Sequence, residues 1–148
     1  MSAIKISQIE AKRLLAMTKR SLIAEFSFPE QNKKEQFDVV GDTKKDIFSI
    51  QVFRGKINPL KYNIGARIKK NGVILMKLHI NSSSVHRNPN GEKIYGSHWH
   101  IYDVKYERGI AFPAEKIESE KFEENTIDFL VQFNVVERPE IHFQTKLA

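Results

Sequence analysis

Four of the five histidines in this 148-residue chain lie in one stretch, as His79, His86, His98 and His100. A histidine side chain has a pKa of about 6.5, so it can take up and release a proton near neutral pH, and its neutral ring can bind a metal ion. Clustering of this kind is unexpected for histidines that serve packing alone. The stretch from His79 to Tyr102 is therefore the candidate site of any chemistry that the chain performs.

The spacing of these residues predicts how they meet. His98 and His100 lie two positions apart on a predicted strand, so their side chains point to the same face, while Trp99 and Ile101 point to the core. His86 begins a long loop that returns to this strand. We therefore expect His86, His98 and His100 to converge within hydrogen-bond or ligand reach.

One use of such a cluster is acid–base cleavage of RNA without a metal ion. A base deprotonates the ribose 2′-hydroxyl, an acid protonates the leaving oxygen, and nearby cations stabilise the charge that develops on the phosphorus centre. His98 and His100 are the predicted acid–base pair, with His86 as the third member. The predicted surface also needs cations that contact the phosphates and aromatic rings on which the bases stack. The predicted nucleic-acid-binding residues are Arg67, Arg87, Lys93, Tyr95 and Tyr102.

Two other uses of the cluster stay open. Two or three neutral imidazoles together with Asp103 or Glu92 could bind zinc or iron. The spacing matches no strong metal signature, so the first expectation is a site with no metal and no cofactor. In the third interpretation the histidines bond to loop backbone and hold a long turn in shape.

Composition and charge narrow the function classes. Cysteine is absent, which excludes disulfides, thiolate metal sites and thiol nucleophiles. The formal net charge of +6 favours an anionic partner such as nucleic acid or an acidic protein surface. A lysine-rich surface that keeps the protein soluble explains the same charge equally well.

The length and the 41% hydrophobic content predict a single domain over residues 1–148. No stretch approaches the roughly 18 apolar residues of a membrane span. The segment from Met1 to Lys12 lacks the long apolar run of a secretory leader. We therefore expect a cytoplasmic protein that makes no contact with a membrane.

Hydrophobic periodicity predicts an α+β fold. The first helix starts after Ser7, which stands three residues before Glu10 as in a capping box, and its apolar positions continue to Leu22. A curved antiparallel sheet of about five to six strands follows. A second amphipathic helix is predicted over Ser119 to Asn134, near the C-terminus.

Alternation of apolar and polar residues places the strands. Asn71-Gly72 is a strong two-residue hairpin signal. The Asn-, Ser-, Pro- and Gly-rich stretch 81–96 is predicted to be a long exposed loop. The expected strands lie near Phe37 to Val40, over Ile47 to Phe53, Tyr62 to Ile68, Val73 to Ile80, His98 to Val104 and Ile110 to Phe112, with a last one over Glu140 to Leu147.

A run of residues through the histidine stretch resembles a family of small uncharacterised proteins of bacteria and their mobile elements. The run reads His86-x-Asn88-Pro89-x-Gly91-Glu92-x-Ile94, then His98-x-His100-x-Tyr102, then Ala111-Phe112-Pro113. This chain has Asn90 where that family usually has Asp, which keeps the turn and removes a carboxylate. A helix followed by a curved sheet also resembles the layout of barnase-like and RelE-like ribonuclease toxins, with which the chain shares no residue motif.

Together these patterns predict a nucleic-acid-directed protein, most concretely a metal-independent endoribonuclease of the toxin type. RNA or another nucleic acid would be its substrate, and an antidote or target protein a further partner. The alternative is a non-catalytic inhibitor from a mobile element or phage that binds a nucleoprotein or protein partner. A histidine-ligated metalloprotein is the third hypothesis.

Overall fold

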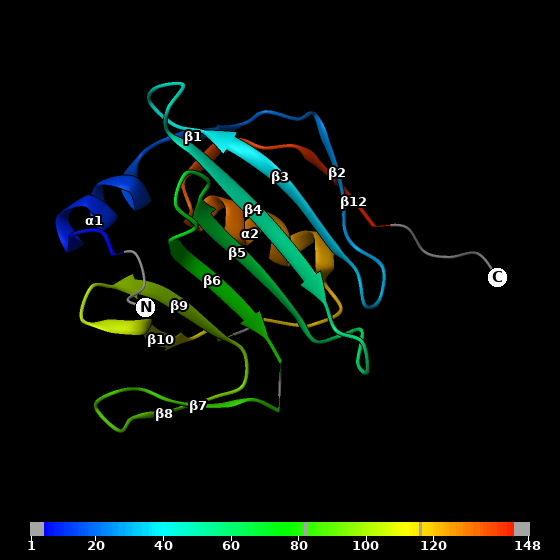
Figure 1. The fold of residues 1–148 in the computed structure, drawn as a ribbon. Coiled ribbons are helices and arrows are strands. Elements are labelled where there is room, and N and C mark those ends of the chain that lie inside the picture. Colours follow the sequence, from blue (N-terminus) through cyan, green and yellow to red (C-terminus); the bar gives the residue numbers. More distant parts are fainter. Residues whose placement is uncertain (1–4, 82, 116, 144–148) are drawn as a thin grey trace.

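The structure is a computed structural model that describes residues 5–81, 83–115 and 117–143. In this part of the chain the main element is an eight-stranded sheet (Figure 1). Its strands are β1 (Lys19–Ser21), β3 (Lys34–Val40), β4 (Ile47–Arg54), β5 (Tyr62–Ile68), β6 (Ile74–Ile80), β9 (His98–Asp103), β10 (Tyr106–Pro113) and β11 (Val135–Glu137). They lie in the order β10-β9-β6-β5-β4-β3-β1-β11.

Two strand pairs and two helices complete the described fold. β2 (Glu25–Ser27) pairs in parallel with β12 (Glu140–His142), and β7 (Val85–Arg87) forms an antiparallel hairpin with β8 (Lys93–Tyr95). The helices are α1 (Gln8–Ala16) and α2 (Phe122–Gln132). Neither of these described helices has the length and apolar character needed to cross a membrane.

The predicted α+β fold with an antiparallel sheet of five to six strands is wrong. The described chain is β-rich, with twelve strands, and its main sheet is mixed because β1 and β11 run parallel. The missed strands β1, β2, β7, β8 and β11 have three residues each, too few for an alternation to stand out. The parallel pair of β1 and β11 also joins segments from opposite ends of the chain, and no hairpin signal connects such segments.

The longer strands follow their predicted positions within a few residues, from β3 to β6 and at β9 and β10. The predicted loop over 81–96 instead contains the β7–β8 hairpin. Of the last predicted strand, residues 140–142 form β12, whereas positions 144–147 lie outside the described residues.

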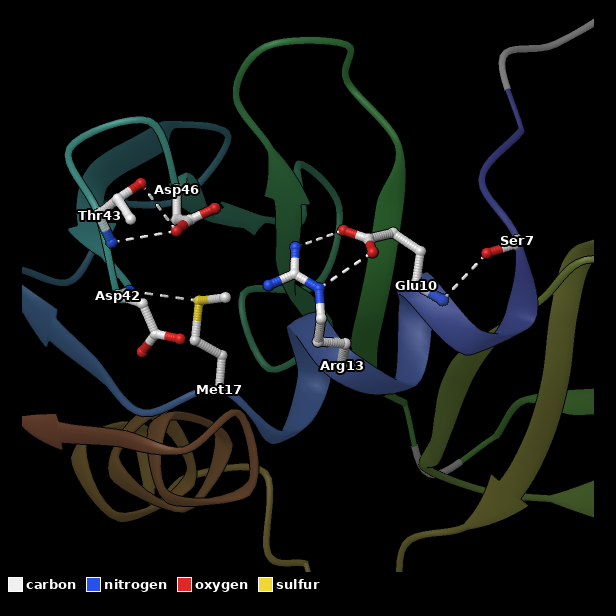
Figure 2. A network of polar contacts seen from close by, with 7 residues as sticks. All are labelled: Ser7, Glu10, Arg13, Met17, Asp42, Thr43 and Asp46. Atoms are coloured by element: carbon white, nitrogen blue, oxygen red, sulfur yellow. Dashed lines mark hydrogen bonds and ion pairs between the residues drawn. The ribbon is translucent and has the colours of Figure 1, made fainter.

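The first helix begins as predicted. Ser7 is its N-cap, and its hydroxyl accepts a hydrogen bond from the Glu10 backbone N–H at 3.0 Å (Figure 2). The Glu10 carboxylate pairs with Arg13 on the helix surface. At the other end of α1, Met17 contacts the turn between β3 and β4, where the Asp42 N–H donates to the Met17 sulfur at 3.4 Å (Figure 2).

The helix ends at Ala16, well before the predicted Leu22, because Lys19 to Ser21 pairs with β3 and β11. The ammonium group of Lys19 is buried. It donates to the carbonyls of Leu15, Met17 and Phe133 at 3.3, 2.8 and 2.9 Å. These carbonyls lie at the C-terminal ends of α1 and α2, where backbone acceptors lack helical partners. Lys19 therefore holds both helix ends together.

The core lies between α2 and one face of the main sheet (Figure 1). Trp99 on β9 stacks on Phe129 of α2 with ring centroids 6.0 Å apart, and Phe48 on β4 meets Phe133 edge to face. The helix α2, which was predicted over Ser119 to Asn134, is confirmed over Phe122–Gln132. In Figure 1 no described helix covers the opposite face of β4, β5 and β6. His79 lies on that face of β6, because it alternates with the core residues Leu78 and Ile80.

Candidate metal centre

Strand pairing brings three histidines together on the face that no described helix covers, where His98 itself is only 2% exposed. His79 on β6 is the direct partner of His98 on β9, and Lys77 is the partner of His100. Direct partners on antiparallel strands have neighbouring side chains. The His79 and His98 ring centroids lie 5.1 Å apart, and those of His98 and His100 lie 4.7 Å apart.

The β7–β8 hairpin adds the fourth ring. His86 pairs with Ile94, which is buried, so both side chains point toward the protein. The His86 ring centroid lies 5.3 Å from that of His98 and 4.8 Å from that of His100. The rings of His86, His98 and His100 therefore lie close together, as predicted. His86 is not part of the group of potential metal ligands, and the predicted catalytic roles of the three rings stay predictions.

His79 is the residue that was missing from the predicted site. One ring nitrogen from each of His79, His98 and His100 can be chosen so that the three atoms lie within 4.8 Å of one another. His79 falls in the same histidine-rich stretch, but its strand and the His98 strand are separated by a long connection. The sequence does not show that these two strands pair, and without that pairing His79 could not be placed in the site.

The hydrogen bond of His98 and the pKa of His79 both suit ligand binding. The Nδ1 of His98 lies 2.8 Å from the Gly96 carbonyl oxygen, so it donates there and the lone pair remains on Nε2. Burial lowers the pKa of His79, and the neighbouring His98, Lys77 and His86 lower it further. His79 is thus neutral at neutral pH, the form in which an imidazole binds a metal ion.

The carboxylates considered as additional ligands lie elsewhere. Glu92 is exposed in the turn of the β7–β8 hairpin. One carboxylate oxygen of Asp103 accepts a hydrogen bond from the Lys105 N–H at 2.8 Å, closing the turn between β9 and β10. Neither residue belongs to the group of potential ligands that His79, His98 and His100 form among the described residues.

Three of the predicted nucleic-acid contacts point away from the histidines. Arg87 pairs with Lys93, and Tyr95 flanks this pair on the same side of the hairpin. All three are exposed, whereas His86 and Ile94 alternate onto the inner side. The structure therefore does not bring these cations and this ring to the cluster.

Tyr102 and Arg67 have different surroundings. The Tyr102 hydroxyl donates to the Ile6 carbonyl at 2.7 Å and accepts from the Ile6 N–H at 3.0 Å, so it anchors the segment before α1. Arg67 lies on the uncovered face and lines a cavity of about 290 Å³. The other lining residues are Lys34, Gln51, Phe53, Asn63, Gly65, Ala66, Ile74 and Lys77.

Fold and site together define a β-rich protein with a histidine cluster on one face of a mixed sheet. The chain belongs to DUF6978, a family of unknown function, whose family model matches residues 6–135. Membership in an uncharacterised family is thereby confirmed, while the match bears on neither the histidine signature nor the likeness to ribonuclease toxins. No curated protein and no solved structure matches the chain.

Proposed function

We propose that the protein binds a divalent transition-metal ion, most simply zinc, through His79, His98 and His100, and uses this ion on an anionic substrate. The observation that carries the proposal is the grouping of three ring nitrogens within 4.8 Å. Zinc–nitrogen bonds of about 2.1 Å in tetrahedral geometry place ligand nitrogens about 3.4 Å apart. Small side-chain rotations close the remaining difference.

A three-histidine set supports a catalytic centre better than a structural one. Structural zinc sites have four protein ligands, whereas catalytic sites have three and leave one position for water or substrate. A bound zinc ion would lower the pKa of a water molecule toward neutral pH and so would supply a nucleophile. His86, next to His100 on the hairpin, is then placed to exchange a proton with a group in the open position.

The second candidate is the metal-independent ribonuclease. It needs an acid and a base on opposite sides of the phosphorus atom, in line with the attacking and leaving oxygens. One imidazole nitrogen then bonds to the attacking oxygen and another to the leaving oxygen. The lengths of these two hydrogen bonds alone add up to more than about 5.5 Å between the two nitrogens. The grouping of His79, His98 and His100 within 4.8 Å favours one ion over a bracketing by two of these three rings, and His86 is not part of that grouping. The observation in favour of the ribonuclease is the cation Lys77 beside His100.

Metal titration of the full chain tests the proposal. Stripped protein is titrated with Zn²⁺ by calorimetry and with Co²⁺ by absorption, which reports the ligand geometry. The expected result is one ion per chain. In the His98→Ala and His79→Ala variants the affinity for the ion should be lower by about a hundredfold or more. His142→Ala is the matched control, because His142 lies outside the cluster, in a second group with the exposed Glu25 and Glu140 that could also hold an ion. Its loss should leave binding at the three-histidine centre unchanged.

The readouts also separate the alternatives. Absence of binding, or equal losses in His98→Ala and His142→Ala, would contradict the metal centre. RNA cleavage that persists in chelator and disappears in His98→Ala would favour the metal-independent ribonuclease. A chain that neither binds metal nor cleaves RNA, and instead captures a protein partner, would match the inhibitor hypothesis.

A further inference from the structure

The cavity beside the histidines has a positively charged lining. Lys34, Arg67 and Lys77 line it, and no acidic residue does. Within the described part of the chain, none of these three cations is joined to a carboxylate by an ion pair. Converging cations with no internal counter-charge attract a phosphate group.

The rest of the cavity wall suits a nucleobase. Phe53 and Ile74 are 43% and 53% exposed, although they lie in a sheet. An exposed aromatic ring offers a face on which a base can stack. The Oδ1 atom of Asn63 is buried and has no hydrogen-bond partner among the described residues. Buried polar atoms are nearly always paired, so this oxygen points to a donor on a bound ligand.

Strand register makes the cavity and the histidine centre one continuous track. Asn63 on β5 pairs with His79, which pairs with His98. In the next row, Gly65 pairs with Lys77, which pairs with His100. The missing side chain at Gly65 leaves the space between Gln51 and Lys77 open. A ligand in the cavity therefore extends directly toward the centre.

We infer that the cavity binds one nucleotide of a single-stranded nucleic acid. Its phosphate lies on Arg67 and Lys77, and its base stacks on Phe53. A single strand is required because paired bases do not offer their faces. The adjoining phosphodiester then reaches the histidine centre, and this last step rests on the proposed function. Single-stranded nucleic acid is then the substrate class of the histidine centre.

Two variants test the cavity in the full chain, with and without Zn²⁺. Gly65→Val fills the space. A Cβ at this position meets nothing closer than 3.8 Å, and valine is among the residues that strands favour. Arg67→Gln removes a phosphate contact. The matched control is Arg87→Gln, on the outer side of the hairpin. The measurement is fluorescence anisotropy with labelled oligouridine RNA and oligothymidine DNA of about ten nucleotides.

The expected result is at least tenfold weaker binding in Gly65→Val and Arg67→Gln, with Arg87→Gln close to the unmodified protein. The two probes decide whether RNA or DNA is preferred. Unchanged binding in Gly65→Val, or an equal loss in Arg87→Gln, would overturn the inference. So would an acidic peptide that competes as well as the oligonucleotide. Zinc titration of Gly65→Val should match the unmodified protein, so a missing metal centre and a missing cavity ligand give different results.

Discussion

Asn88 bonds with both ends of its side-chain amide to the backbone of Ala111. Its Nδ2 donates to the Ala111 carbonyl at 2.9 Å, and its Oδ1 accepts from the Ala111 N–H at 2.9 Å. Ala111 belongs to β10, the strand at one edge of the main sheet. The buried Asn88 thus takes the place of a neighbouring strand and ties the β7–β8 hairpin, with His86, to the sheet.

Replacing Asn88 by alanine should lower the free energy of unfolding by about 2 kcal/mol, because two buried backbone groups lose their partners. Chemical denaturation measures this change, and Asn90→Ala in the exposed turn serves as the control. Zinc affinity should fall far less than in His98→Ala, since the three proposed ligands lie on the main sheet. A loss of zinc binding as large as that of His98→Ala would make His86 a required ligand.

Lys19 should make stability depend on pH. Burial lowers the pKa of Lys19 to about 7, from 10.5. Below pH 7 the ammonium is charged in both states. Between 7 and 10.5 the unfolded chain keeps the proton that the folded protein releases, so the free energy of unfolding rises with pH. We expect a rise of about 2 kcal/mol between pH 7 and 9.

Denaturation at a series of pH values checks this prediction, with Lys19→Met as the comparison. The variant should lack the rise that Lys19 contributes. Equal slopes in both proteins would mean that the three carbonyls keep the folded ammonium charged throughout this range.

Two glycines should respond very differently to alanine. A Cβ at Gly55 would lie 2.7 Å from the Asn58 carbonyl oxygen and 2.8 Å from that of Lys61. Backbone must then move, and we expect a cost of about 2 kcal/mol. At Gly65 the nearest atom is 3.8 Å away, so Gly65→Ala should be within about 0.5 kcal/mol of the unmodified protein. Thermal unfolding of both variants compares them directly.

Binding of the oligonucleotide should weaken steeply as salt rises, because lysine and arginine side chains replace phosphate counterions. In Arg67→Gln the slope of log affinity against log salt should decrease by about one, the share of one phosphate contact. Arg87→Gln should keep the original slope. Affinity that does not change with salt would make the charge of +6 a property of solubility alone.

Patterns within short windows of sequence correctly predicted side-chain directions on one strand, the start of the first helix and the position of the second. Side-chain direction alternates along any strand, so the common face of His98 and His100 and the inward position of Trp99 followed from spacing. The start of α1 at Ser7 and the apolar stripe of the second helix are equally local. These features depend on residues close together in the chain, which is why the sequence by itself determined them.

Tertiary structure alone decided which strands became neighbours. The pairing of β6 with β9 added His79 to the cluster and placed Lys77 and Gly65 in one row with His100. The β7–β8 register turned Arg87 outward, although the sequence favoured it as a site residue. A shift of one residue in register would reverse every side chain of a strand. Register across long connections is set by packing of the whole sheet, and no local pattern records it.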